Sequence, residues 1–101
     1  MISVGFYEEM NMYNNNGPIK ESLVESVNYN KKKVIEYIKN NKVVGICARP
    51  AIDCITGEEI SSGFQILNDG EYEWADFLAY HIAKYNLTLP KAFLEKINAY
   101  S

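Results

Sequence analysis

The sequence has few of the residues that build catalytic or metal centres. Among its 101 residues are one histidine, His81, and two cysteines, Cys47 and Cys54. A protein metal site usually needs several such ligands close together, so we expect no metal and no cofactor. The two cysteines lie on one extended segment, where about 3.3 Å per residue separates them beyond disulfide reach unless the chain folds back. Two reduced thiols are typical of a cytosolic protein.

Long apolar runs are also missing. No stretch approaches the roughly 18 apolar residues that a membrane-spanning helix needs. The first residues, MISVGFYEEM, lack the basic region of a signal peptide and continue into glutamates. We therefore expect no membrane association and a cytoplasmic location. The chain length fits a single domain over residues 1–101.

The first half of the chain is predicted to be mainly helical. We expect a short strand over residues 3–6, a polar loop over 11–17, a helix that begins at Pro18 and a helix over 31–39. Ile19 and Leu23 would share the buried face of the earlier helix. Asn30 can cap the later helix, and Asn40 and Asn41 can end it in a left-handed conformation.

The middle of the chain shows the patterns of β-strands. KVVGICAR, residues 42–49, is apolar on both faces, as in an interior strand. ISSGFQIL alternates, with Ile60, Phe64 and Ile66 facing inward, and NDG is a strong hairpin signal. EYEW then places Tyr72 and Trp74 on one face. Together these segments predict a three-stranded antiparallel meander over residues 42–74.

The last third of the chain is predicted to be helical again. Trp74, Leu78, Ile82 and Tyr85 follow a helical repeat, which predicts a helix over residues 75–85. Asp76 would lie in its first turn, where a carboxylate favours the helix dipole. A final helix begins at Pro90. The predicted fold class is α+β, a small antiparallel meander packed by helices.

Charge is strongly segregated along the sequence. The stretch from Asp53 to Asp76 holds seven carboxylates and no lysine or arginine, whereas the stretch from Lys31 to Arg49 has a net charge of +5. Acidic surfaces steer basic partners toward a protein. The predicted partner-binding residues are Asp53, Glu58, Glu59, Asp69, Glu71 and Glu73. One partner is not expected to reach both hairpin ends, and we favour residues 69–73; the alternative is that acids merely keep hairpin ends soluble and unpaired.

The sequence gives little support to catalysis or nucleic-acid binding. Phe77 and Tyr85 lie one helical turn on either side of His81, which favours a packing role for this histidine. A rival hypothesis is a small hydrolase that uses His81 with Asp76 or a cysteine thiolate. The lysines at 31–33 are interpreted as a solvated helix face, because the whole chain has a net charge of −3. We therefore expect neither an enzyme nor a nucleic-acid partner.

Three segments carry a family resemblance. TGEEI, NDGEYEW and DFLAYHIAKYNLTLPKAFLEKI, within residues 56–97, resemble a pattern in small bacterial proteins that are similar to immunity proteins of toxin systems. VGFYEEM near the start is similar as well. The resemblance implies a protein that neutralises a cognate toxin by binding it, with the acidic stretch facing a basic toxin. The shared positions are ones a fold needs, so none is transferred as a binding residue.

A second class of function stays open beside immunity. The protein would then be a regulatory or scaffold module that self-associates through its strands or aromatic residues. Immunity proteins can dimerise too, so the oligomeric state would not choose between these hypotheses, and the sequence does not predict that state.

Overall fold

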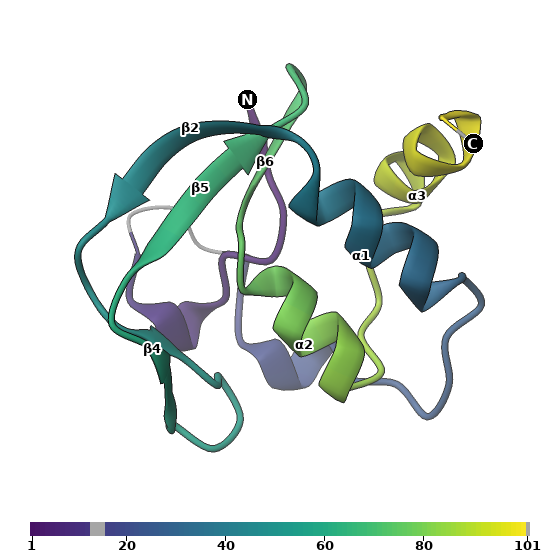
Figure 1. The fold of residues 1–101 in the computed structure, drawn as a ribbon. Helices are drawn as coiled ribbons and strands as arrows, with labels where there is room; N and C mark the ends of the chain where they lie inside the picture. Colours follow the sequence, from purple (N-terminus) through teal and green to yellow (C-terminus); the bar gives the residue numbers. More distant parts are fainter. Residues whose placement is uncertain (13–15, 101) are drawn as a thin grey trace.

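A mixed β-sheet and three α-helices dominate the fold (Figure 1). The computed structural model describes residues 1–12 and 16–100. The strands in these residues are β1 (Ile2–Ser3), β2 (Lys42–Cys47), β3 (Ala51–Ile52), β4 (Glu59–Ser61), β5 (Phe64–Asn68) and β6 (Tyr72–Ala75). The helices are α1 (Lys31–Lys39), α2 (Leu78–Lys84) and α3 (Lys91–Ala99), with short 3-10 helices η1 (Glu8–Met10) and η2 (Ile19–Ser22). The predicted α+β class is confirmed.

The predicted meander forms the centre of a larger arrangement. β2, β5 and β6 are antiparallel neighbours, and β1 adds to β6 in parallel, so the order is β1-β6-β5-β2. β3 and β4 form a separate two-stranded sheet between β2 and β5 in the sequence. The turn between β3 and β4 contains Gly57, whose φ of +79° favours glycine. The meander prediction did not include this inserted hairpin. It also did not include β1, which pairs over residues 2–3, whereas a separate strand over residues 3–6 was predicted.

Strand β2 lies at one edge of the sheet, not in its interior. In the described part of the chain it pairs with β5 and has no second neighbour. Its side chains are mostly exposed, and a bulge between Val43 and Gly45 shifts the register. The interior prediction failed because an apolar pattern on both faces does not show whether another strand is present to cover the outer edge.

The segment predicted as one strand, residues 60–67, is divided between β4 and β5. The Ser61 hydroxyl donates to the Gly63 carbonyl at 2.7 Å, across the break. Phe64 and Leu67 are buried, whereas Ile66 is only half-buried. The predicted alternation, which placed Phe64 and Ile66 inward, is therefore wrong for Leu67. This residue is buried and pairs with Trp74 of β6.

Helix α1 confirms its predicted bounds. The Asn30 side chain accepts a hydrogen bond from the backbone N–H of Lys33, as an N-cap does. At the other end Asn40 has a φ of −105°, so the predicted left-handed conformation is wrong there. Its side-chain amide instead donates to the Glu36 carbonyl, which satisfies an open group of the last turn.

The predicted α-helix that begins at Pro18 does not form; the residues directly after Pro18 form only the short helix η2. Ile19 is buried as expected, but Leu23 is 40% exposed. Leu23 is extended because residues 22–24 pair with residues 86–88: Val24 donates to the Asn86 carbonyl and Leu23 bridges Leu87. This long-range pairing overrides the local helical pattern. Of the predicted polar loop over 11–17, residues 13–15 lie outside the described residues.

Helix α2 begins at Leu78, three residues later than predicted. Trp74 and Ala75 belong to β6, and Asp76 does not lie in the helix. The Asp76 carboxylate accepts from the backbone N–H of Gln65, and its own N–H donates to the Gln65 carbonyl. Asp76 therefore extends the pairing of β5 beyond β6 rather than favouring a helix dipole.

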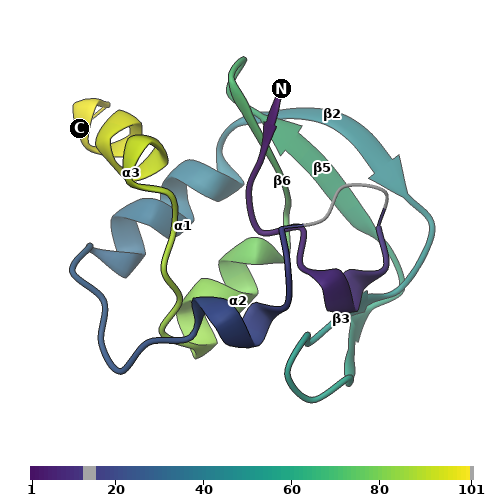
Figure 2. The same ribbon diagram turned by 180° about the vertical axis from the view of Figure 1, so that it is seen from behind.

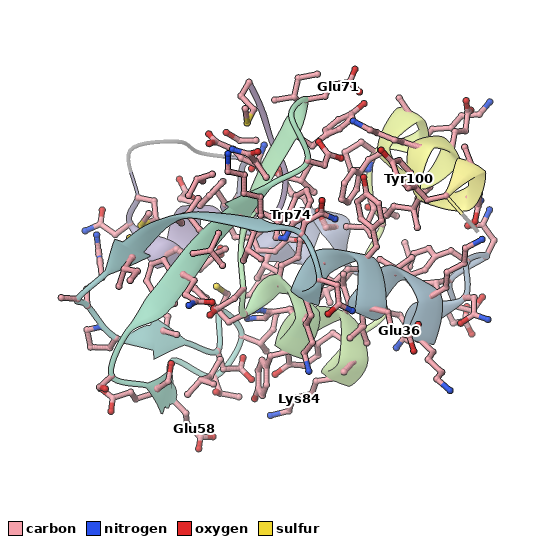
Figure 3. The ribbon with its side chains drawn as sticks, turned by 45° about the horizontal axis from the view of Figure 1, so that its top comes forward. Glu36, Glu58, Glu71, Trp74, Lys84 and Tyr100 are labelled. Atoms are coloured by element: carbon pink, nitrogen blue, oxygen red, sulfur yellow. The ribbon has the colours of Figure 1, made fainter. Side chains whose placement is uncertain are left out.

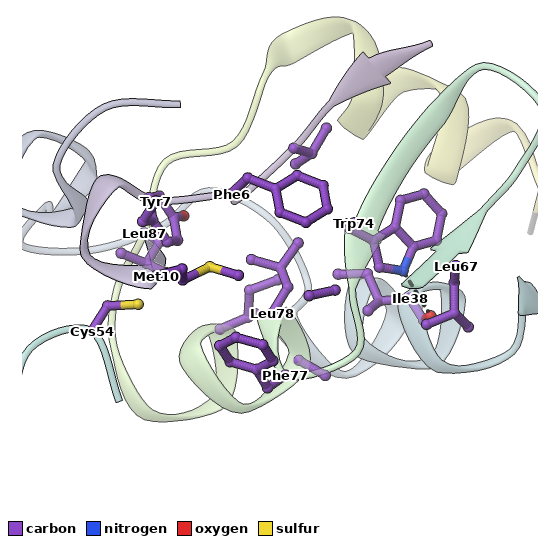
Figure 4. Close-up of a cluster of buried hydrophobic side chains, with 14 of the residues drawn as sticks. Phe6, Tyr7, Met10, Ile38, Cys54, Leu67, Trp74, Phe77, Leu78 and Leu87 are labelled. Carbon is purple, nitrogen blue, oxygen red and sulfur yellow. Dashed lines mark hydrogen bonds between the residues drawn. The ribbon is translucent and has the colours of Figure 1, made fainter. Parts of the chain in front are cut away.

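Trp74 lies at the centre of the core. It is fully buried, and its indole Nε1–H donates to the Ile38 carbonyl at 3.0 Å (Figure 4). Its ring packs against Phe93 of α3 and Tyr37 of α1. The N-terminal segment with η1 and η2 lies on the side seen in Figure 2. No helix within the described ranges has the length and apolar content that crossing a bilayer requires.

Candidate partner-binding surface

The six predicted acidic residues divide between two ends of the molecule. Figure 3 shows Glu58 and Glu71 at opposite ends. We call the β3–β4 hairpin with Asp53, Glu58 and Glu59 the Asp53 end. The β5–β6 hairpin with Asp69, Glu71 and Glu73 is called the Asp69 end. One flat partner surface would not cover both.

Asp53 lies inside the protein. Its relative exposure is 0%, so the prediction that it faces a partner is wrong. Its Oδ1 accepts hydrogen bonds from the backbone N–H groups of Ile55 and Thr56 at 2.8 and 3.0 Å. Because a carboxylate can accept several hydrogen bonds at once, Asp53 organises the turn that connects β3 to β4.

Helix α2 and Tyr85, the residue that directly follows it, supply the remaining side-chain partners of Asp53. The Tyr80 hydroxyl donates to Oδ2 at 2.8 Å, the Tyr85 hydroxyl donates to the same oxygen at 2.7 Å, and Lys84 Nζ lies 3.2 Å away. Burial by itself raises the pKa of Asp53, but hydrogen bonds from Tyr85, Thr56 and Tyr80 hold it well below its usual range. The carboxylate therefore stays charged and ties the β3–β4 hairpin to α2.

Sequence reasoning missed this tie, although a signal was present. Tyr80 and Lys84 are four residues apart and so share one helix face. The helical repeat makes Tyr85 the last member of an apolar stripe. Its ring also carries a hydroxyl group, which needs a hydrogen-bond partner when the side chain is half-buried. A cluster of tyrosine and lysine at this spacing indicates an anionic partner elsewhere in the fold.

His81 is buried beside Asp53 and is bonded only to backbone groups. Its Nε2 accepts from the N–H of Cys54 at 2.9 Å, and its Nδ1 lies 3.0 Å from the Phe77 carbonyl. This pattern assigns a neutral ring protonated on Nδ1. Burial lowers the pKa of His81, which favours the same neutral form. Rings of Tyr7, Phe77, Tyr80 and Tyr85 surround it.

The rival hydrolase hypothesis gains no support from this arrangement. His81 is 1% exposed, and backbone atoms occupy both ring nitrogens. Burial, with Glu9 and Asp53 nearby, raises the pKa of the Cys54 thiol to about 12, so this thiol stays protonated at neutral pH. The ring is not bonded to a carboxylate. That the protein is not an enzyme stays a prediction.

Glu58 and Glu59 are the exposed acids of the Asp53 end. The Glu58 backbone N–H is held by the Thr56 hydroxyl at 3.2 Å. Within residues 1–12 and 16–100 neither carboxylate forms an ion pair. Their charges are therefore available to another molecule.

Asp69 is the internal anchor of the other end. Its side chain is 2% exposed, so it too was wrongly expected to face a partner. Oδ1 accepts from the N–H groups of Glu71 and Tyr72 at 2.9 and 2.7 Å, and Oδ2 accepts from the Tyr37 hydroxyl at 2.6 Å. Burial raises the pKa of Asp69, but these hydrogen bonds outweigh it and lower the pKa overall. Asp69 thus holds the hairpin in shape.

Glu71 and Glu73 project from this hairpin in different environments. The Glu71 side chain is 56% exposed and lies 3.1 Å from Lys96 Nζ, which also contacts Asp69. Glu73 is half-buried and accepts a hydrogen bond from the Ser3 hydroxyl at 3.4 Å. Glu71 is therefore accessible to another molecule, and Glu73 is accessible only in part.

A groove of about 480 Å³ opens beside the Asp69 end, between α1 and α3. Its lining residues are Lys33, Glu36, Tyr37, Asn40, Asn41, Ile97 and Tyr100. Tyr100 is 70% exposed, and its ring packs against Tyr37, the residue that bonds Asp69. Tyr100 is not among the residues predicted to bind a partner, because a single tyrosine outside a repeat or motif gives no signal in the sequence.

The fold explains why the acidic stretch contains no base. Lys84 of α2 pairs with Asp53, and Lys96 of α3 pairs with Asp69 and Glu71. The balancing charges thus come from helices that follow the stretch in sequence and pack beside it in space. Part of the acidic excess is internal structure rather than surface.

The described residues contain no group of histidine, cysteine and carboxylate side chains arranged to hold a metal ion. Their buried side-chain nitrogen and oxygen atoms all have hydrogen-bond partners. No family model matches the chain, and no curated protein or solved structure matches it either. The likeness to immunity proteins therefore depends on the sequence motifs.

Proposed function

We propose that this protein is an immunity protein that binds a basic bacterial toxin through its Asp69 end. The observation that carries the proposal is the combination of a fixed acidic hairpin with an exposed tyrosine and a groove. Glu71 provides charge, and Tyr100 provides a large ring at low cost in conformational entropy. Tyrosine is enriched at the energetically important centres of protein interfaces.

The hairpin is prepared for binding before a partner arrives. Asp69 accepts from two backbone N–H groups and from Tyr37, so the positions of Glu71 and Glu73 need little further ordering. A preordered surface loses less entropy on association. Lys96 is the local competitor: a basic group of the toxin would have to share or replace its contact with Glu71.

The test is binding kinetics with a toxin domain encoded beside the gene, at two salt concentrations. The double variant Glu71→Lys, Glu73→Lys should slow association and flatten its salt dependence, with a loss of about 1 kcal/mol for the exposed Glu71 charge. Tyr100→Ala should mainly speed dissociation, because it removes contact area rather than charge. Circular dichroism confirms that each variant is folded.

The matched control is the double variant Glu58→Lys, Glu59→Lys at the Asp53 end. It makes the same charge change on a hairpin that the proposal does not use, so association should be nearly unchanged. Unchanged association in the Glu71→Lys, Glu73→Lys variant would contradict the proposal. Equal slowing in both double variants would show a general charge effect and would contradict the placement of the toxin at the Asp69 end.

A further inference from the structure

The outer edge of β2 is an unusual apolar feature of the surface. Val43, Val44 and Ile46 are 45%, 47% and 79% exposed. Ile46 lies opposite Gln65 of β5, which is also exposed, so this part of the sheet face is open. Exposed edge strands with aliphatic side chains are templates for pairing with another chain.

Opposite charges lie at the two ends of this strand. Lys39 and Lys42 are exposed where β2 begins, after α1. The chain leaves the other end of β2 toward the β3–β4 hairpin, where Ile52 pairs with Glu59 (Figure 1). In the described part of the protein these two lysines form no ion pair, and neither do Glu58 and Glu59.

We infer that β2 is the docking edge for a second copy of this chain, paired antiparallel about a two-fold axis near Ile46. Such an axis reverses the strand direction, so the Lys42 end of each copy lies beside the Glu59 end of the other. The charges then match at both ends of the interface, and the aliphatic side chains cover one another. A symmetric interface of this kind is self-complementary.

Charge favours a second copy over the proposed toxin at this edge. A uniformly basic partner would meet Glu58 and Glu59 at one end but Lys39 and Lys42 at the other. The second copy meets the opposite sign at each end. This inference does not rest on toxin binding, which is assigned to the Asp69 end.

The bulge in β2 limits the extent of the pairing. Bulges reduce strand pairing at sheet edges because they interrupt the regular ladder of backbone hydrogen bonds. The two-fold axis near Ile46 leaves the regular residues Gly45–Cys47 to form the ladder, with Val44 adding apolar contact. A strand pair this short buries less than the roughly 1,200 Å² of a stable interface. We therefore expect a dimer that dissociates on dilution.

Sedimentation velocity over a range from about 5 µM to about 1 mM tests the dimer, because weak interfaces dissociate in this range. The wild-type chain should shift from monomer to dimer as concentration rises. Ile46→Lys should remain monomeric throughout with an unchanged thermal midpoint, because Ile46 is exposed. Val24→Lys is the matched control, an exposed aliphatic residue on the segment that pairs with residues 86–88, and it should dimerise like the wild type.

A charge exchange tests the arrangement of the two copies. Lys42→Glu and Glu59→Lys should each weaken dimerisation several-fold, and the double variant should recover most of it because opposite charges again meet across the axis. A monomeric wild type at the highest concentration would overturn the inference, as would dimerisation of Ile46→Lys. If Ile46→Lys instead weakened toxin binding and the wild type stayed monomeric, the edge would belong to the toxin. Failure of the double variant to recover would overturn the antiparallel arrangement.

Discussion

The two ends of the molecule are built around the same device, a buried aspartate that closes a turn. Asp53 and Asp69 each accept from two backbone N–H groups that follow them in sequence. Each also accepts from at least one tyrosine hydroxyl and contacts one lysine of a later helix. In both cases hydrogen bonds outweigh the effect of burial and lower the pKa of the aspartate.

The surroundings of the two aspartates differ. Asp53 bonds Tyr80 of α2 and Tyr85, which directly follows this helix, and lies beside the buried, neutral His81. Asp69 bonds one tyrosine of α1, and its lysine is shared with the exposed Glu71. The Asp53 end is therefore tied more deeply into the core, whereas the Asp69 end presents charge on a fixed hairpin. A carboxylate in an acidic stretch can thus serve structure at one end and position a surface at the other.

The substitution with the largest expected effect is at Trp74, and it should destabilise both ends of the molecule. Trp74 lies on β6, which starts at the Asp69 hairpin and leads to α2, the helix that holds Asp53. Trp74→Ala should lower the free energy of unfolding by about 3–5 kcal/mol, because it leaves a large cavity and an unpaired Ile38 carbonyl. Urea denaturation measures this change. A variant as stable as the wild type would contradict the central position of Trp74.

A direct comparison of the two aspartates should give unequal losses. Asp53→Ala leaves two tyrosine hydroxyls and two N–H groups without their acceptor, so we expect a loss of about 2–4 kcal/mol. Asp69→Ala is expected to cost about 1–2 kcal/mol, because it leaves one tyrosine hydroxyl, rather than two, without its acceptor. Both are measured by urea denaturation at pH 7. Equal losses would show that the second tyrosine hydroxyl at Asp53 does not distinguish the two ends.

His81 gives the Asp53 end a pH response that the Asp69 end lacks. Burial lowers the pKa of His81, so below the unfolded value of about 6.5 the unfolded chain binds more protons than the folded protein. Stability should therefore fall as pH falls from 6.5 to 5, by at most about 1.4 kcal/mol per pH unit. Asp53 and Asp69, whose pKa values are lowered, contribute stability above about pH 4 and lose it only in stronger acid.

The His81→Gln variant isolates this response. It removes the titrating ring, so unfolding free energies measured at pH 5, 6 and 7 should differ less than those of the wild type. The variant will be less stable at pH 7, because the N–H of Cys54 loses its acceptor, but that offset does not depend on pH. A wild-type slope that persists unchanged in the variant would contradict the assignment to His81.

The elements that the sequence predicted best are those whose signals are local. Helix α1 has a capping asparagine and an amphipathic stripe, and α3 follows a proline; both formed where the pattern placed them. The NDG hairpin formed because Gly70, with a φ of +95°, allows the turn. These features depend on residues only a few positions apart.

The failures depend on residues far apart in sequence. Leu23 is extended because Leu87 bridges it, and β2 is exposed because no later strand covers its outer edge among the described residues. Asp53 is buried because Tyr85, 32 positions away, reaches it. The sequence shows which residues are charged but not which carboxylates pair with a lysine of a later helix. For this reason all six candidate acids were predicted to face a partner.

The smallest expected effect compares the opening of the two ends through the reactivity of the cysteines. Cys54 follows Asp53 and is 7% exposed, whereas Cys47 is half-buried on β2. Because burial raises the pKa of Cys54 to about 12, its thiolate forms only when the Asp53 end opens. A disulfide reagent should therefore label Cys54 in a Cys47→Ser variant much more slowly than it labels Cys47 in a Cys54→Ser variant. Adding Asp53→Ala to the former should speed labelling far more than adding Asp69→Ala; equal acceleration would show that the two ends open together.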